Sequence, residues 1–123
     1  MFFPRLVLEW NSLGASKEQF KEFTDGLALN QGIEILDLRN NQITDESTVD
    51  LANALKHNTV MIEVDLRWNS VGVVGAKALW DVLQQPSSAI LKLQLCGNFI
   101  PDEISSYIGP LNMCKKCRTG WFA

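Results

Sequence analysis

Four stretches of this 123-residue chain carry the same pattern of residues at nearly the same spacing. In each stretch a leucine or valine is followed by any residue, a leucine, two variable residues and an asparagine. The four sets are Leu6/Leu8/Asn11, Leu36/Leu38/Asn41, Val64/Leu66/Asn69 and Leu93/Leu95/Asn98. The asparagines lie 30, 28 and 29 residues apart. Such a period is typical of a solenoid, in which each repeat packs only against its neighbours.

The apolar pairs of the pattern predict four short strands. Residues two apart in a strand point to the same face, so both members of each pair face a core. The asparagine follows where the chain leaves the strand, and the backbone groups there need hydrogen-bond partners. A buried asparagine costs free energy unless its amide is paired. We therefore expect a structural asparagine ladder with one amide per repeat, formed by Asn11, Asn41, Asn69 and Asn98.

Between the strands the apolar residues follow a helical period. The three sets are Phe20/Phe23/Leu27, Val49/Ala52/Leu55 and Ala76/Leu79/Val82/Leu83. The first set lies two residues further from its asparagine than the others, which predicts an insertion in the loop before the first helix. Residue types typical of helix ends predict starts at Ser16 and at Thr44 or Asp45, and ends at Asn30 and Asn58. The predicted fold is an α/β solenoid with a parallel sheet on its concave side and helices outside.

Two further stretches, "VGAKAL" (Val74–Leu79) and "ALKHNTV" (Ala54–Val60), resemble the ribonuclease-inhibitor-like class of leucine-rich repeats. The words "LEWNSLG", "LDLRNNQI" and "DLRWNSVG" resemble the repeats of a centrosomal member of this class. The resemblance covers about residues 6–104. It implies a non-catalytic protein-protein interaction module, with centrosomal linker components as partners. It also implies a role in centrosome cohesion and cilium assembly.

The repeat pattern assigns residues 1–106 to one leucine-rich-repeat domain of about four repeats. Residues 107–123 form a divergent tail, because the pattern breaks at Gly109 and Pro110 where a helix would be expected to continue. In the centrosomal relative, as the resemblance implies, a long coiled coil follows the repeats. This chain has no heptad pattern. We therefore interpret it as a truncated or alternatively spliced form.

Charge and hydropathy exclude two kinds of partner. The net charge of -3 is small and its charged residues are spread along the chain, so we expect no binding to nucleic acid or to an anionic membrane. No run of about 18 apolar residues occurs, so no membrane-spanning segment is predicted. The three cysteines, Cys96, Cys114 and Cys117, are few and odd in number, which favours a reducing compartment. The predicted location is the cytoplasm, and by resemblance the centrosome.

Candidate catalytic and metal-binding residues are sparse. Cys114 and Cys117 form a C-x-x-C pair, but a structural zinc site needs four ligands, and only Cys96 and His57 remain. The single histidine has no evident nucleophile beside it and falls at a helix end. Gly72 and Gly75 lie before a predicted helix, where we expect them to serve turn geometry rather than phosphate binding. We predict no enzyme activity, no cofactor and no metal site.

Residues that alternate with the apolar pairs face the other side of the sheet. Asp37 with Arg39, and Asp65 with Arg67, should form a block of opposite charges on this solvated face, with Glu9 beside Arg39. Trp10 and Trp68 come where their strands end. One interpretation is a mutually satisfied ion ladder, which would add little stability because exposed pairs are worth about 0 to 1 kcal/mol.

A second interpretation is a partner-binding patch on the concave face. Tryptophan and arginine dominate the binding energy of protein interfaces, and the concave face of a solenoid is its usual binding surface. The candidate partner-binding residues are Trp10, Asp37, Arg39, Asp65, Arg67 and Trp68.

The alternative to a binding module is an uncapped repeat fragment without independent activity. Terminal repeats normally need polar caps for solubility. Here the first strand carries an apolar edge formed by Phe2, Phe3, Leu6 and Leu8. If nothing covers this edge, we expect self-association through it.

Overall fold

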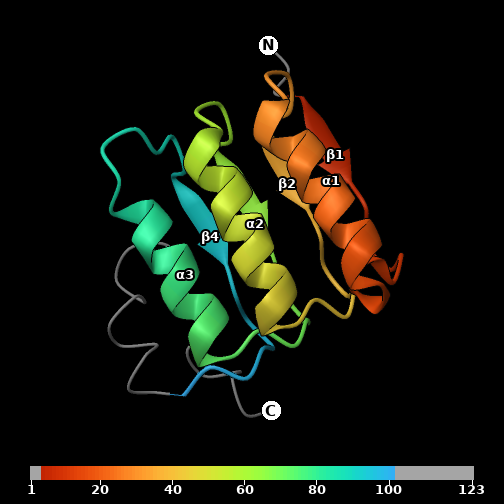
Figure 1. The fold of residues 1–123 in the computed structure, drawn as a ribbon. Helices are drawn as coiled ribbons and strands as arrows, with labels where there is room; N and C mark the ends of the chain where they lie inside the picture. The colour runs from red at the N-terminus through yellow and green to blue at the C-terminus, as the bar shows by residue number, and fades with distance from the viewer. Residues whose placement is uncertain (1–3, 102–123) are drawn as a thin grey trace.

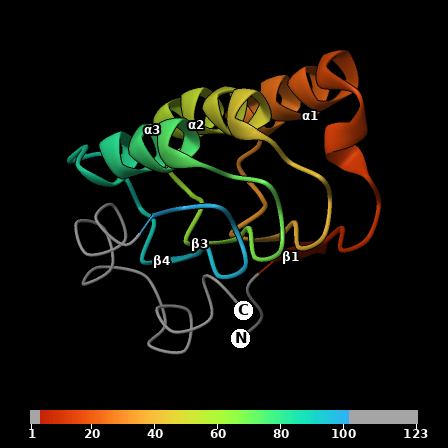
Figure 2. The ribbon, with the colours of Figure 1, turned by 90° about the horizontal axis from the view of Figure 1, so that it is seen from below.

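Strands and helices alternate along the chain in the computed structural model, which describes residues 4–101. The strands are β1 (Arg5–Val7), β2 (Ile35–Asp37), β3 (Glu63–Asp65) and β4 (Lys92–Gln94). The helices are α1 (Lys17–Leu29), α2 (Asp45–His57) and α3 (Val73–Leu83), and a short 3-10 helix, η1 (Leu13–Ala15), precedes α1. Figure 1 shows the three helices side by side over the sheet. Figure 2 shows the resulting two layers, helices on one side and strands on the other.

The strands pair in parallel and in chain order, β1-β2-β3-β4. The register aligns equivalent positions of the repeats: Leu6 pairs with Leu36, Leu36 with Val64, and Val64 with Leu93. The predicted α/β solenoid, with a parallel sheet and outer helices, is therefore confirmed. We call the sheet face that the helices leave uncovered the open face.

One hydrophobic core lies between the sheet and the helices. Each strand contributes the apolar residues of its repeat pattern, and each helix contributes one apolar stripe, as its period of 3.6 residues requires. In the first repeat, Leu6 and Leu8 are only partly buried and pack against this core. The largest fully buried side chains are Phe20, Leu36, Leu38, Ile43, Leu51, Leu55, Met61, Leu66, Leu79, Leu95, Ile100 and Val64.

The helix ends follow the residue types that the sequence offers. Ser16 is the N-cap of α1, and its side chain accepts a hydrogen bond from the backbone N–H of Gln19 at 3.3 Å. Thr44 is the N-cap of α2, and Asn30 and Asn58 are the C-caps of α1 and α2. The insertion predicted before the first helix corresponds to η1, which lies in that loop.

Gly72 and Gly75 serve a different purpose from the one that the sequence suggested. Gly75 lies inside α3, and Gly72, its N-cap, has a φ of -111°, which any residue adopts. A Cβ atom on Gly72 would lie 2.9 Å from Oδ2 of Asp45, and one on Gly75 would lie 2.8 Å from Oδ1 of the same carboxylate. A side chain at either position would displace the Asp45 carboxylate, so the two glycines leave room for this carboxylate and do not serve a turn.

Several predictions concern residues beyond the described range. The domain boundary at residue 106 and the tail 107–123 lie outside residues 4–101, as do Phe2, Phe3, Cys114 and Cys117. The boundary and the tail remain predictions. Within the described range, the helices are too short and too polar to cross a membrane.

Candidate functional site

The repeat asparagines bind the backbone of their own repeat and of the preceding one. Oδ1 of Asn69 accepts hydrogen bonds from the backbone N–H groups of Asn41 at 2.8 Å and Ile43 at 3.0 Å. Its Nδ2 donates to the carbonyls of Leu38 at 2.9 Å and Leu66 at 3.1 Å. Four backbone groups at the strand ends are thus paired by one amide, which is 5% exposed.

Two of the other three asparagines of the ladder also bind the preceding repeat, and the third does not. Asn41 binds back to the first repeat, and Asn98 binds back to the third. Asn11 belongs to the first repeat and is exposed. Its Nδ2 donates only to the carbonyls of Leu8 and Glu9, within its own repeat. Among the described residues, Oδ1 of Asn11 accepts no hydrogen bond.

A second asparagine position, which the sequence interpretation treated only as a helix end, also links neighbouring repeats. Asn58 is 3% exposed, and its Nδ2 donates to the carbonyls of Leu27 at 2.9 Å and Asn30 at 3.1 Å. Its Oδ1 accepts from the backbone N–H groups of Val60 and Met61, each at 2.9 Å. The 28-residue spacing between Asn30 and Asn58 was a signal that could have identified this position.

On the open face, β2 and β3 each carry an aspartate that binds the arginine two residues further along the chain. Nε of Arg39 donates to Oδ1 of Asp37 at 3.0 Å, and Nη2 donates to Oδ2 at 2.8 Å. Arg67 binds Asp65 in the same way, at 3.0 Å and 2.7 Å. The backbone N–H of each arginine also donates to its aspartate. Paired hydrogen bonds of this kind fix the plane of the guanidinium.

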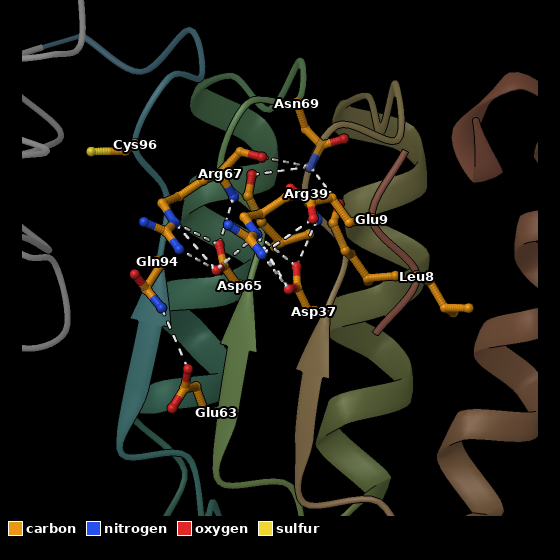
Figure 3. A network of polar contacts seen from close by, with 12 residues as sticks. Leu8, Glu9, Asp37, Arg39, Glu63, Asp65, Arg67, Asn69, Gln94 and Cys96 are labelled. Carbon is orange, nitrogen blue, oxygen red and sulfur yellow. Dashed lines mark hydrogen bonds and ion pairs between the residues drawn. The ribbon is translucent and has the colours of Figure 1, made fainter. Parts of the chain in front are cut away.

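The two pairs are joined across the strands, as Figure 3 shows. Nη2 of Arg39 lies 3.4 Å from Oε1 of Glu9 in the first repeat, and its Nε lies 3.6 Å from Oδ2 of Asp65 in the third. We call Glu9, Asp37, Arg39, Asp65 and Arg67 the ion ladder. It crosses the open face from the first repeat to the third.

The aspartates of the ion ladder are less exposed than the sequence suggested. We expected the whole block to lie on a solvated face, but Asp37 is 2% exposed and Asp65 is 5% exposed. The arginine side chains, each 30% exposed, fold back along their own strands and cover the carboxylates. A charge without a partner would be costly at such a depth, so the arginines are needed where they lie.

This arrangement shifts the ionisation of Asp37 and Arg39. Burial alone would raise the pKa of Asp37, but the hydrogen bonds from the guanidinium and backbone N–H of Arg39 outweigh it, together with the charges of Arg39 and Arg5. The pKa of Asp37 therefore lies below its ordinary value. The hydrogen bond to Asp37 raises the pKa of Arg39, and Glu9 and Asp65 add to the effect. Both members of the pair are charged at neutral pH.

Trp10 and Trp68 form a separate feature at the edge of the open face. Trp10 is 72% exposed and Trp68 is 51% exposed. They line one cleft of about 210 Å³ together with Ser12, Asn40, Gln42, Asn69 and Ser70. We call it the tryptophan cleft. Arg39 and Arg67 do not line this cleft. The six predicted partner-binding residues therefore divide into the ion ladder, which holds four of them, and the tryptophan cleft, which holds two.

The described residues contain no group of three or more metal-ligating side chains. His57 ends α2, apart from the open face. Cys96, which directly follows Leu95 of the fourth repeat pattern, is disulfide-bonded. The cysteine content had favoured a reducing compartment over a disulfide scaffold, and the disulfide at Cys96 does not follow from that interpretation.

Comparisons with known proteins agree with this geometry. Residues 29–52 and 57–79 match the family profile described as Leucine Rich repeat. The fold is similar to that of the leiomodin-1 structure titled Actin-Binding Site 2, with a TM-score of 0.71 and 16% identity over 94% of this chain and 75% of that one. It is also similar to a tropomodulin C-terminal domain from Caenorhabditis elegans. That TM-score is 0.75, with 11% identity over 97% of this chain and 80% of that one.

The chain therefore has the fold of a leucine-rich-repeat solenoid, as the repeat pattern predicted, and two of its repeats match the family profile. Its sequence is similar to that of leucine-rich repeat-containing protein 45 from Gallus gallus, with 53% identity over 51 residues. This match confirms the resemblance drawn from the repeat words. It covers 42% of this chain and only 8% of the chicken protein, so it concerns a small part of that protein.

Proposed function

We propose that the chain is a non-catalytic module that binds another protein on the open face of its sheet. The observation that carries this proposal is the ion ladder. Its charged side chains are fixed by mutual hydrogen bonds before any partner arrives, so binding would immobilise few further rotamers. A partner would meet a face whose charges are already arranged, which favours specificity more than affinity.

The ionisable groups on this face support binding rather than catalysis. Enzymes usually position a carboxylate or a base so that it can exchange a proton near neutral pH. The carboxylate of Asp37 is instead held in its charged form by Arg39. Arg67 donates hydrogen bonds to both carboxylate oxygens of Asp65 in the same geometry. Both carboxylates hold the arginine side chains in position on the open face.

We also propose a role at the centrosome, in cohesion of centrosomes and in cilium assembly, with centrosomal linker components as the partners. The support is the similarity to leucine-rich repeat-containing protein 45 over 51 residues. Fluorescence imaging of the tagged chain in ciliated cells, against a centriole marker, tests this part. A uniform cytoplasmic signal that never coincides with the marker would contradict the centrosomal role and leave the binding module intact.

Site-specific photo-crosslinking tests the open face as the binding surface. Benzoylphenylalanine placed at Val7, which is 53% exposed on the open face beside Asp37, should crosslink a partner in cell extract. The same probe at the exposed Lys77 on α3 is the matched control and should crosslink little. A partner that crosslinks from Lys77 and not from Val7 would move the binding surface to the helices.

A second candidate is the uncapped fragment that associates with itself, and the first repeat favours it. β1 is an edge strand, and an unpaired edge is a template for pairing with another chain. Among residues 4–101, Oδ1 of Asn11 and Nδ2 of Asn30 make no hydrogen bond. The same atoms of Asn69 and Asn58 bind the preceding repeat. A groove of about 350 Å³ lies beside α1, lined by Glu22, Phe23, Gly26, Leu27, Asn30 and Ile33.

Light scattering after size-exclusion chromatography separates the two candidates. Self-association through the first repeat predicts a mass that rises with concentration and a return to the monomer when Phe23 is replaced by glutamate. Circular dichroism must remain unchanged in that variant. A monomer of 13.8 kDa at every concentration would exclude the self-associating fragment.

A further inference from the structure

The residue directly before each asparagine of the asparagine ladder adopts the same unusual backbone conformation in all four repeats. The φ angles are 66° at Trp10, 56° at Asn40, 61° at Trp68 and 74° at Gly97. Positive φ is natural for glycine and tolerated by asparagine, but it is strained for a bulky aromatic residue. Two of the four repeats nevertheless place tryptophan there.

The chain itself shows that the turn does not need tryptophan. Asn40 and Gly97 make the same turn in the second and fourth repeats with residue types that suit it. Trp10 and Trp68 are therefore strained at a position where the other two repeats have residues that adopt positive φ more easily. Trp10 remains 72% exposed and Trp68 51% exposed, so the strain is retained where at least half of each side chain stays in water, which points to a use of the side chain.

The two indoles and the groups between them form a site with unused hydrogen-bond donors. Among residues 4–101, the indole N–H groups of Trp10 and Trp68 donate no hydrogen bond, and the side-chain amide of Asn40 is also without a partner. Ser12, Gln42, Asn69 and Ser70 complete the polar lining, and none of the lining residues is ionisable. The cleft therefore offers aromatic faces, neutral donors and no charge.

Gly97 holds one side of the cleft in place. A Cβ atom on Gly97 would lie 2.2 Å from Cε3 of Trp68, so the indole of Trp68 rests directly on the backbone of the next repeat. The ring of Trp68 is thereby positioned before any ligand binds. Preorganised aromatic side chains bind with little further loss of conformational entropy.

We propose that the tryptophan cleft binds an extended, uncharged, proline-containing segment of the partner protein. Prolines lie flat against aromatic rings in a polyproline II segment, and this backbone presents carbonyl acceptors while it lacks the N–H donors that would compete. The unused indole and amide donors match those carbonyls. No carboxylate lines the cleft, so it offers no counter-charge to a charged peptide or to the cationic head of a methylated lysine.

The size of the cleft suits this occupant. A volume of about 210 Å³ is smaller than the range of about 300 to 1,000 Å³ typical of small-molecule sites, so one or two residues fill it. The inference rests on the proposed protein-binding function and specifies the chemistry of its partner. The ion ladder, which neighbours the cleft on the same face, would then contact the residues that flank the proline.

The experiment observes the indole N–H resonances of the ¹⁵N-labelled full chain during titration with acetylated decaproline. We expect saturable shifts for Trp10 and Trp68 and none for Trp80, which packs against the core. Trp10→Asn and Trp68→Asn should each weaken binding at least tenfold, and Asn40 shows that asparagine suits this backbone. The exposed Leu29→Ala, on α1, is the matched control and should bind as the wild type does.

Three outcomes would overturn the inference. They are unshifted Trp10 and Trp68 resonances, equal decaproline affinity in the two asparagine variants, and larger shifts with cellotetraose or a trimethyllysine peptide than with decaproline. Crosslinking from Val7 is independent of this titration. If Val7 still crosslinks a partner while decaproline fails, the proposed function stands and only the proline specificity is wrong; if crosslinking fails as well, both are wrong.

Discussion

The carboxylate of Asp45 in α2 caps the helix of the next repeat. Its Oδ1 accepts hydrogen bonds from the backbone N–H groups of Gly72 at 2.7 Å and Gly75 at 2.9 Å, at the start of α3. The N-cap of α3 is a glycine without a side chain of its own. The first turn of α3 therefore depends on a residue that lies 27 positions earlier in the sequence.

Replacing Asp45 with alanine should lower the free energy of unfolding by about 2 kcal/mol, because two N–H groups lose a charged acceptor at a helix N-terminus. Urea denaturation followed by circular dichroism measures this change. Asp81→Ala removes an exposed carboxylate from α3 and should cost less than about 0.5 kcal/mol. Equal effects of the two substitutions would show that Asp45 does not act as a cap.

Positions in the asparagine ladder should differ in their contribution to stability. Asn69→Ala leaves two N–H groups and two carbonyls of the strand ends without their amide, so we expect a loss of about 3 kcal/mol or more. Asn11→Ala removes two hydrogen bonds at an exposed site and should cost within about 1 kcal/mol. Thermal unfolding of both variants is the measurement, and a comparable loss in both would argue against the ladder as a source of stability.

The Asp37–Arg39 pair predicts a dependence of stability on pH. The folded-state pKa of Asp37 lies below its ordinary value of 3.8, so the unfolded chain binds the proton more readily. The stabilisation is fully present above that ordinary value and is lost as the pH falls through the lowered folded-state pKa. The wild type should therefore be more stable than Asp37→Asn at pH 7, and the difference should narrow below about pH 4. Urea denaturation across pH 7 to 2.5 measures it, and a difference that stays constant over this range would be the contrary result.

Trp68→Asn should leave the stability of the fold unchanged or raise it by up to about 1 kcal/mol, since positive φ costs an ordinary residue about 1 to 2 kcal/mol and asparagine less. Loss of the contact with Gly97 offsets part of this gain. Trp80→Asn is the comparison, and it should be strongly destabilising because Trp80 packs against the core. Calorimetry measures the change in stability of the two variants. A large loss of stability in Trp68→Asn would make Trp68 a structural residue.

The sequence predicted the repeats well because their period constrains both the strands and the core. The alignment of Leu36 with Val64 in the register, and the positions of the helix ends Asn30 and Asn58, follow from spacing alone. The burial of Asp37 could not be predicted this way. Alternation places Asp37 on the open face, but it does not show that Arg39 folds back along the strand and covers the carboxylate.

Two further features were missed for different physical reasons. The link from Asp45 to Gly72 joins two repeats through a side chain whose equivalent in the third repeat is Val73, so the apolar repeat pattern gives no sign of it. The positive φ of Trp10 and Trp68 contradicts the preference of the residue type, and local propensity would exclude it. Their shared position with Asn40 and Gly97 in the repeat was the available signal.

The direction of the asparagine contacts has a consequence for biosynthesis. Asn41, Asn58, Asn69 and Asn98 all donate their Nδ2 groups to carbonyls of the preceding repeat. As a ribosome extends the chain from its N-terminus, each of these amides emerges when its acceptors have already been made. Every new repeat can then dock on the finished end of the growing stack, without waiting for residues that are still to be translated.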